Sequence, residues 1–296
     1  MFSGEKFSME VIIVNNCQDD QTIKEVKKRF SRFMFIQNNV NGGFANGCNL
    51  GAENSLGEFL LFLNPDTVAT ESEIEKLLIA ARSDSSNYIL SCRQVRENSR
   101  ESKVTADFPE MWNLTGFLRL ITGWRNMIYS KDRRVLFPDC VSGSVIMIRR
   151  EIFFKVKGFD EDFWMYLEDT DLCRRIRNTG AKIAYYRDIE IMHAHGGSSR
   201  IDLKTISITK CEVMISKHVY IQKHKTGADR TFIQAFMVVN NLLTGLILGL
   251  SGIILFFIPA LLVRTWIFLR LLNYYTGSFF RHSWISPRSV NFKIDR

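Results

Sequence analysis

The sequence predicts an α/β protein with a doubly wound, mostly parallel, Rossmann-like sheet and an apolar helical segment toward its C-terminus. Short β-branched runs alternate with short amphipathic runs from Met9 to about Arg187, as expected of strands joined by crossover helices. From Thr231 to Val263 no charged residue occurs, so an apolar second part follows. A chain of 296 residues accommodates one medium-sized domain with such an extension.

The predicted strands and helices alternate along the first part of the chain. Strands are expected at 9–14, 32–37, 58–63, 88–92, 144–149 and 181–187, and helices at 19–30, 43–54, 71–82 and 151–156. Another helix begins in the acidic run Glu168–Asp171 and ends before Gly180. Such sheets bind ligands at the carboxyl ends of their strands, and Asn15 and Asp66 lie just beyond two of these ends.

Charge and cysteine content narrow the class of function. The formal net charge of +8 suits an anionic partner, such as a phosphate-bearing substrate or a lipid surface. No recognition helix, zinc finger or aromatic single-strand motif supports nucleic-acid binding. The six cysteines lack metal-ligand spacing, which is typical of reduced thiols in a cytosolic domain, and the short polar stretch Met1–Ser8 is not a signal peptide.

The charge-free stretch is long enough for a membrane segment. One interpretation is a single span at Leu242–Val263, and another is a hairpin that turns near Gly249–Gly252 with a second arm to about Leu272. Basic residues on both sides fit a hairpin with both ends on the cytoplasmic face. A soluble hairpin folded onto the domain is the third alternative. Phe108–Tyr129, aromatic and apolar, is either an interfacial helix, part of an acceptor site, or an ordinary packed helix.

Two groups of carboxylates are candidates for acid–base catalysis or metal binding. Glu168, Asp169 and Asp171 crowd the first turn of one predicted helix, where capping of exposed N–H groups is the simpler explanation for the cluster alone. Asp66 follows an apolar strand, where a carboxylate together with substrate phosphates could hold Mg²⁺ or Mn²⁺. An ordinary Asn-Pro-Asp turn is the alternative for Asp66.

Two histidines and a glycine-rich run complete the candidate motifs. His193 and His195 lie in a predicted loop with Ser198 and Arg200, where a metal ligand, a phosphate contact and a solvated side chain are all compatible with the sequence. The run from Asn41 to Gly51 opens a helix whose N-terminus could face a ligand, but it lacks the dinucleotide and P-loop spacings.

In this order the motifs resemble the family 2 glycosyltransferases, and within them the rhamnosyltransferase-like branch. The residues that carry the resemblance lie between Met9 and Arg200: 14–16 with Asp19 and Asp20, 41–45, 49–51, 63–67, 142–144, 158–161, 166–172 and 193–199.

The resemblance implies a GT-A fold, a nucleotide-sugar donor and a divalent metal, Mg²⁺ or Mn²⁺. It assigns Asp66 to metal and donor, Asn15, Asn41 and Asn49 to the donor, Asp169 with Glu168 beside it to catalysis, and His193 to the metal or the diphosphate. From the loop residues themselves, His195, Ser198 and Arg200 are possible diphosphate contacts. A sugar hydroxyl needs a base to accept its proton, and a departing diphosphate needs its charge stabilised. The expected activity is inverting transfer of rhamnose from dTDP-rhamnose, or of another hexose, to a lipid-linked or cell-surface glycan.

The expected organisation combines this resemblance, which ends at about Arg200, with the charge and hydropathy pattern of the remaining chain. Residues 1–200 form the catalytic domain, 201–230 a basic helical connector, 231–275 a membrane-associated segment or hairpin, and 276–296 a basic tail at the cytoplasmic face of the cell membrane.

The sequence departs from the family at its start. Family members carry a strand and helix ahead of the unit that begins at Met9, and Met1–Ser8 cannot supply them. Asn15 stands where aspartate is common and Gln18 where serine is common. A start codon assigned too late and a decayed gene product both explain this. The rival function is therefore a truncated, catalytically impaired remnant that acts as a membrane-bound interaction protein.

Overall fold

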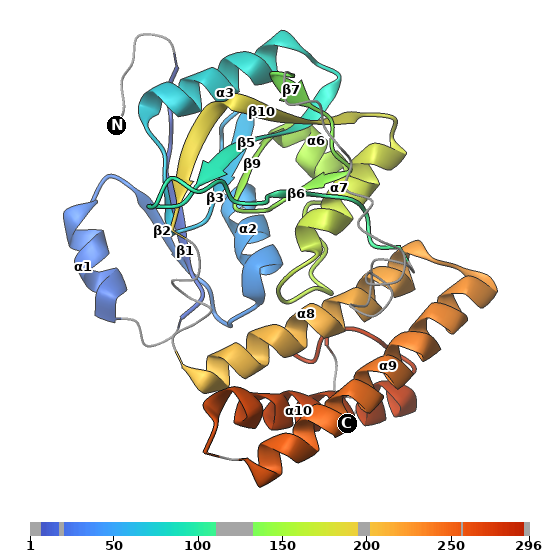
Figure 1. Ribbon diagram of the computed structural model, residues 1–296. Coiled ribbons are helices and arrows are strands. Elements are labelled where there is room, and N and C mark those ends of the chain that lie inside the picture. The colour runs from blue at the N-terminus through green and yellow to red at the C-terminus, as the bar shows by residue number, and fades with distance from the viewer. Residues whose placement is uncertain (1–6, 18–20, 111–132, 195–201, 256, 293–296) are drawn as a thin grey trace. The chain divides into compact units, whose positions relative to one another are not determined.

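The computed structural model describes residues 7–17, 21–110, 133–194, 202–255 and 257–292 (Figure 1). The chain divides into two compact units. The α/β unit comprises residues 1–108, 128–161 and 168–195, and the helical unit comprises 109–127, 162–167 and 196–296. Most of the aromatic segment Phe108–Tyr129 lies outside the described residues.

The α/β unit contains the alternating elements that the sequence predicts (Figure 1). Its strands are β1 (Ile12–Asn15), β2 (Met34–Gln37), β3 (Phe59–Leu63), β4 (Thr67–Val68), β5 (Asn87–Val95), β6 (Thr105–Ala106), β7 (Val135–Leu136), β8 (Cys140–Val141), β9 (Val145–Arg149) and β10 (Lys182–His193). Its helices are α1 (Gln21–Arg29), α2 (Gly43–Glu53), α3 (Glu71–Ser83), α6 (Arg150–Lys155) and α7 (Glu168–Asn178). The predicted α/β class is confirmed.

The main sheet is mixed. Its strand order is β3-β9-β5-β10-β4, with β7 also pairing β10, while β1 and β2 form a separate parallel pair and β6 and β8 a separate antiparallel one. Within the main sheet β5 and β10 are parallel, whereas β9 runs antiparallel to both β3 and β5. The long central pair β5–β10 therefore carries residues from distant parts of the sequence to one end of the sheet.

Strand alternation divides the core of this unit between the two faces of the sheet. Ile89, Ile148 and Ile183 pack on one face with residues of α2, α6 and α7. Their neighbours Leu90, Met147 and Ala184 pack on the other face with α3. The start of α3 is fixed by a capping box, in which Thr70 and Glu73 satisfy each other's backbone N–H groups.

The end of β10 differs from the prediction. The sequence predicts a strand over 181–187 and places His193 in the following loop, but β10 continues through a register irregularity between Tyr186 and Glu190 and ends at His193. The extension forms because Met192 and His193 pair antiparallel with Val68 and Thr67 of β4. His193 is consequently held by a strand ladder rather than by a loop.

The helical unit contains α8 (Leu203–His224), α9 (Gly227–Ile254) and α10 (Pro259–Arg281). Helices α9 and α10 form an antiparallel hairpin, because Thr265 donates to the carbonyl of Gly249 and Asn241 donates to the hydroxyl of Tyr275. The connection lies at 255–258, so the predicted turn at Gly249–Gly252 is wrong: these glycines are helical. By length and composition α9 is apolar enough to cross a membrane.

Candidate active site

Asp66 and His193 form the centre of the candidate site. Asp66 follows β3 in a tight turn, in which both the amide and the hydroxyl of Thr67 donate to the carbonyl of Asn64. The amide of Ala194 donates to the carbonyl of Asp66, which continues the β4–β10 pairing past His193. As a result His193 Nε2 lies 3.1 Å from Asp66 Oδ1, although the two residues are 127 positions apart.

Gln94 orients the ring of His193. From the interior of β5, Gln94 Oε1 lies 2.8 Å from His193 Nδ1 and also accepts a hydrogen bond of 2.8 Å from the hydroxyl of Ser144. An amide oxygen only accepts, so this contact requires a proton on Nδ1. Nε2 is then the ring nitrogen that faces the carboxylate of Asp66. Gln94 and His193 are both buried.

The turn from Ser142 to Ser144 connects this pair to Asp169. The amide of Asn64 donates to the carbonyl of Ser144, which ties the turn to the end of β3. One residue earlier, the amide of Gly143 donates to Asp169 Oδ2 at 2.8 Å. A Cβ on residue 143 would lie 3.2 Å from the ring of Phe44 and 3.4 Å from Cβ of Asp169, so glycine permits this close approach. The structure thus brings Asp66, His193 and Asp169 into one network.

Glu168 and Asp169 are adjacent carboxyl groups in different surroundings. Asp169 Oδ1 accepts from the amide of Thr170 at 2.6 Å and from its hydroxyl at 3.2 Å. Desolvation raises the pKa of Asp169, and the hydrogen bonds from Gly143 and Thr170 oppose that rise. Burial and the neighbouring charge of Asp169 raise the pKa of Glu168 well above its ordinary value. One carboxylate oxygen of Glu168 is buried without a hydrogen-bond partner among the described residues.

The different surroundings of Glu168 and Asp169 favour different chemical roles for the two carboxyl groups. Burial with one unbonded oxygen disfavours the charged form of Glu168, whereas hydrogen-bond donors stabilise the ionised form of Asp169. A pair whose surroundings drive the two pKa values apart is a feature of acid–base sites. The geometry therefore favours Asp169 over Glu168 as a proton acceptor, and this role remains a prediction.

The asparagines assigned to the donor have local partners. Asn15, at the end of β1, donates to Gln37 Oε1 and to the carbonyl of Cys17. Asn41 accepts from the amide of Gly43 at the entry to α2. Asn49 bonds the amide and the carbonyl of Phe159 and also donates to Glu161. None of the hydrogen bonds just described involves Asp66 or Asp169, so donor contact stays a prediction for each asparagine.

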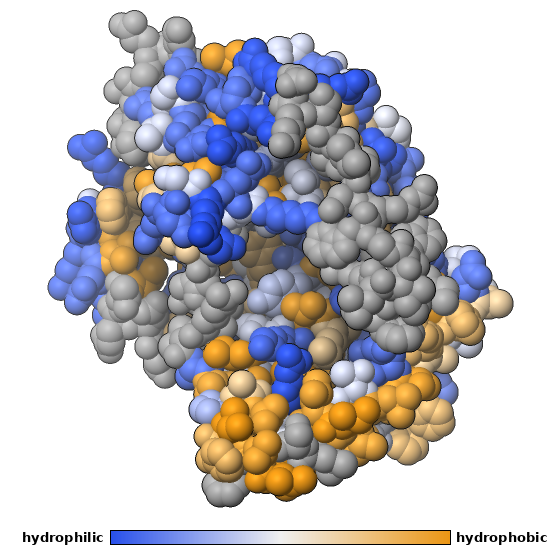
Figure 2. Space-filling model, viewed as in Figure 1, coloured by the Kyte–Doolittle hydropathy of each residue, from blue (hydrophilic) through white to orange (hydrophobic). Residues whose placement is uncertain are grey.

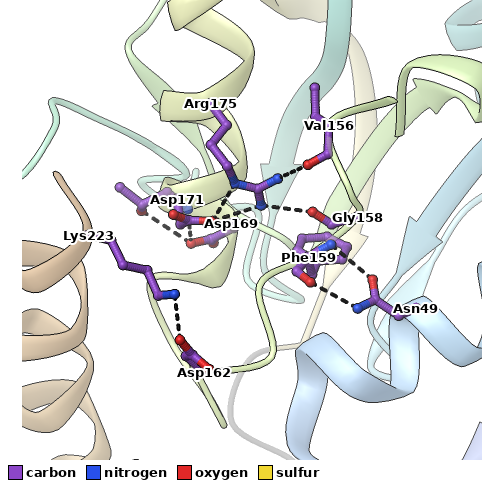
Figure 3. A network of polar contacts seen from close by, with 10 residues as sticks. Asn49, Val156, Gly158, Phe159, Asp162, Asp169, Asp171, Arg175 and Lys223 are labelled. Carbon is purple, nitrogen blue, oxygen red and sulfur yellow. Dashed lines mark hydrogen bonds and ion pairs between the residues drawn. The ribbon is translucent and has the colours of Figure 1, made fainter. Parts of the chain in front are cut away.

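Asn49 and Arg175 hold the turn that contains Gly158 and Phe159 (Figure 3). The guanidinium of Arg175 pairs with Asp171 at 2.7 Å, donates to the carbonyl of Gly158 at 2.8 Å and also bonds the carbonyl of Val156. Gly158 adopts a positive φ of 64° and a Cβ there would lie 2.6 Å from Asn49. The sequence motif around Gly158 is thus a structural turn, held by hydrogen bonds from Asn49 of α2 and Arg175 of α7.

His195, Ser198 and Arg200, the expected diphosphate contacts, lie outside the described residues.

The residues present fit a divalent cation. A carboxylate oxygen and an imidazole nitrogen converge 3.1 Å apart, and the negative charge of the carboxylate favours a cation there. No group of three His, Cys, Asp or Glu side chains is assembled anywhere in the described chain. Two protein ligands leave coordination positions for phosphate oxygens and water, which is how Mg²⁺ is commonly bound. The amide of Gln94 provides the outer hydrogen bond that metal-bound histidines usually have.

Comparison with curated proteins identifies rhamnosyltransferases. The chain is 25% identical over 199 residues to rhamnosyltransferase WbbL of Escherichia coli, covering 62% of this chain and 72% of that protein. It is 24% identical over 196 residues to dTDP-rhamnosyl transferase RfbF of Shigella flexneri, covering 64% and 61%. Over 62 residues it is 39% identical to N-acetylglucosaminyl-diphospho-decaprenol L-rhamnosyltransferase of Mycobacterium tuberculosis, covering 21% and 20%.

A solved structure shares the fold. Mannosyltransferase PcManGT of Pyrobaculum calidifontis, in complex with GDP-Man and Mn²⁺, superposes with a TM-score of 0.51 at 13% identity, covering 93% of this chain and 79% of that chain. The fold is therefore of the GT-A type.

Family models match along most of the α/β unit. Residues 127–195 match the model described as the N-terminal domain of galactosyltransferase. Residues 5–156 match the model described as glycosyl transferase family 2. Because this second match alone covers more than half of the chain, the protein is a glycosyltransferase that belongs to family 2, and rhamnosyltransferases are among the relatives that it resembles.

Proposed function

We propose that this glycosyltransferase moves rhamnose from dTDP-rhamnose to a hydroxyl of a lipid-linked or cell-surface glycan, with inversion at the anomeric carbon. The names of the relatives support this choice, since they include a dTDP-rhamnosyl transferase and a rhamnosyltransferase for a diphospho-decaprenol-linked sugar. The observation that carries the proposal is the hydrogen-bonded network that joins Asp66 and His193 through Gln94 and Ser144 to the turn that binds Asp169.

Asp169 acts on the acceptor. Its carboxylate accepts the proton of the acceptor hydroxyl as that oxygen forms a bond to the anomeric carbon. The bond between the anomeric carbon and the diphosphate oxygen breaks on the opposite side, and dTDP leaves with the electron pair. The amides of Gly143 and Thr170 hold the carboxylate in one orientation, which keeps it aimed at the acceptor.

Asp66 and His193 act on the leaving group. Together they would hold a divalent cation, Mg²⁺ or Mn²⁺, which when bound neutralises the charge that develops on the departing diphosphate. Gln94 keeps the proton of His193 on Nδ1, so that Nε2 faces the diphosphate side as an electron-pair donor. Asn15, Asn41 and Asn49 are the proposed donor contacts on the nucleotide side.

The proposed location is the cytoplasmic face of the cell membrane. A lipid-linked acceptor has its reactive sugar at the membrane surface, and the helical unit presents exposed apolar side chains on α9 and α10. The chain's formal charge of +8 would favour an anionic lipid surface.

A donor panel tests the proposal. Purified full-length protein is incubated with Mn²⁺, a polyprenyl-diphosphate-linked sugar and one of several nucleotide sugars, and the product is identified by mass. We expect a deoxyhexose to be added from dTDP-rhamnose, and Asp169→Asn to abolish the addition while dTDP binding, measured by calorimetry, persists. Transfer from another nucleotide sugar but not from dTDP-rhamnose would refute the donor. Failure with every donor, together with absent nucleotide binding, would favour the non-catalytic alternative.

A further inference from the structure

The hairpin of α9 and α10 carries an apolar stripe. Side chains at Phe232, Val239, Leu243, Ile247 and Ile254 repeat at helical spacing, so they lie along one face of α9, and each is between 55% and 74% exposed. At the tip of the hairpin Phe257 is 68% exposed. Figure 2 shows hydrophobic residues gathered over these helices. Exposed apolar surface of this length marks an interaction site.

Glycines of α9 allow close packing between α9 and α10. A Cβ at Gly252 would lie 2.3 Å from the carbonyl oxygen of Leu261, and Gly245 and Gly249 pack against the ring of Phe268. Thr265 adds a hydrogen bond to the carbonyl of Gly249. Because α10 is packed this closely along the second half of α9, α9 cannot enter a bilayer without taking α10 with it.

The arginines of α10 limit the depth to which the hairpin can enter a lipid bilayer. Arg264 is exposed and lies about 8 Å along the helix from Pro259, and Arg270 lies about 17 Å from it. If α9 crossed a hydrocarbon core of about 30 Å, the tip would reach the far side and Arg270 would sit near the middle, where arginine is costly. A hairpin that instead lies along the surface, with its apolar side buried by about 5–10 Å, leaves Arg264 within reach of the headgroups.

We propose that the α9–α10 hairpin inserts its tip and the stripe of α9 into one leaflet of an anionic membrane and does not span the bilayer. From Gly227 to Arg281 the hairpin contains four arginines and a single aspartate, which complements anionic headgroups. This inference deepens the membrane location proposed above, but it requires neither a sugar donor nor an acceptor. It keeps the hairpin of the sequence alternatives but places that hairpin along the membrane surface.

Vesicle flotation tests the surface. Full-length protein is mixed with vesicles of phosphatidylethanolamine and phosphatidylglycerol, or of phosphatidylcholine alone, and floated on a density gradient. We expect stronger binding to the anionic vesicles. The triple variant Ile247→Ser, Ile254→Ser and Phe257→Ser should weaken binding by roughly tenfold for each side chain that inserts. The control variant Ile79→Ser removes an apolar side chain of α3 that is 57% exposed and should bind like the parent.

A depth measurement distinguishes insertion from spanning. In a Cys17→Ser background, which removes the exposed native thiol, Phe257→Cys is labelled with a nitroxide and its depth is read by paramagnetic resonance. We expect the label to lie about 5–10 Å below the phosphates. In a second sample the Phe257→Cys variant is left without the nitroxide. If an impermeant thiol reagent enclosed within the vesicles reacts with its free thiol, the tip crosses the bilayer and the proposal is overturned.

A second copy of the chain is the competing occupant of the stripe. Light scattering of the vesicle-free protein reports its mass. A parent protein that binds no vesicles and forms a dimer which the triple variant dissociates would overturn the proposal. None of these measurements uses dTDP-rhamnose. A donor panel without transfer would therefore not change the conclusion on membrane binding, and a failure to bind vesicles would not change the conclusion on the donor.

Discussion

Replacing Gln94 by leucine tests the contact that the candidate active site depends on. Leucine retains the volume but removes Oε1, which accepts from both His193 Nδ1 and the hydroxyl of Ser144. Ser144 retains the hydroxyl of Ser142 at 3.0 Å as a partner. The principal effect therefore falls on the ring of His193, whose tautomer and orientation are no longer set by a neighbouring acceptor.

Two magnitudes follow from these contacts. Loss of an outer hydrogen bond to a metal-binding histidine weakens metal affinity by about 10–100-fold, which corresponds to about 1.4–2.7 kcal/mol. Loss of a buried hydrogen-bond acceptor also destabilises the fold by about 1–3 kcal/mol, or roughly 2–12 °C in thermal midpoint for a chain of this size. The first effect is specific to the site and the second is not.

A control on the same strand separates the two effects. Ser91 is also buried in β5 and donates 2.7 Å to the carbonyl of Val145, but it does not bond His193. Ser91→Ala should lower stability by a similar amount and leave metal affinity unchanged. Titration of Mn²⁺ by paramagnetic resonance in the presence of dTDP, with parallel calorimetric melting curves, measures both quantities without requiring turnover.

Gln94→Glu supplies the opposite test. A carboxylate can only accept, so it should keep the proton on Nδ1 and preserve or strengthen Mn²⁺ binding. The reasoning would be refuted if Gln94→Leu bound Mn²⁺ as tightly as Ser91→Ala does. Tighter binding by the leucine variant would show that Gln94 presents its NH₂ group to the ring.

Three further predictions concern stability. Arg175→Met removes the partner of the buried Asp171 and two bonds to backbone carbonyls, so it should lower the thermal midpoint by roughly 6–12 °C, for about 3 kcal/mol, whereas Arg177→Met on the same helix should have little effect. The raised pKa of Glu168 stabilises the fold most below pH 4.5, and this contribution is lost as pH rises through the raised value; Glu168→Gln should remove part of that decline in denaturant unfolding. Burial lowers the pKa of His218 from 6.5 to about 4, so stability should fall by about 3 kcal/mol as pH drops through that interval, and an unchanged pH profile in His218→Gln would contradict this origin.

The sequence was sufficient to predict the α/β class because each local pattern agrees with the fold. Capping at Thr70 and Glu73, the alternation of Ile89 and Leu90, and the left-handed glycine at position 180 after α7 all act over a few residues. Asp66 could be singled out for the same reason, since a polar turn directly follows an apolar strand. Its pairing with a histidine 127 residues later could be suggested only by resemblance.

Long-range pairing explains what the sequence could not predict. The two-residue strand β4 has no periodicity of its own, yet it extends β10 and fixes His193 beside Asp66. Gln94 was missed because the predicted strand ended at Cys92, whereas β5 runs to Val95. The sequence shows Gln94 only as a polar residue two positions beyond the predicted end of the strand, next to Arg93. Sequence alone does not distinguish such a residue from one in a loop. Asn49 bonds Phe159 and Glu161, which lie 110 and 112 residues away, and the sequence does not predict these contacts.

The three acids at the start of α7 show why capping and catalysis could not be separated before the partners were known. All three benefit from the positive end of the helix. Asp171 is committed to Arg175 four residues later, a local and structural task. Asp169 instead receives an amide from Gly143, which belongs to the turn that also bonds Gln94 and the end of β3. Glu168 is buried with its pKa raised well above the ordinary value. A position in the first turn does not distinguish the three carboxylates, so the contacts made from outside the helix are what favour Asp169 as the proposed base.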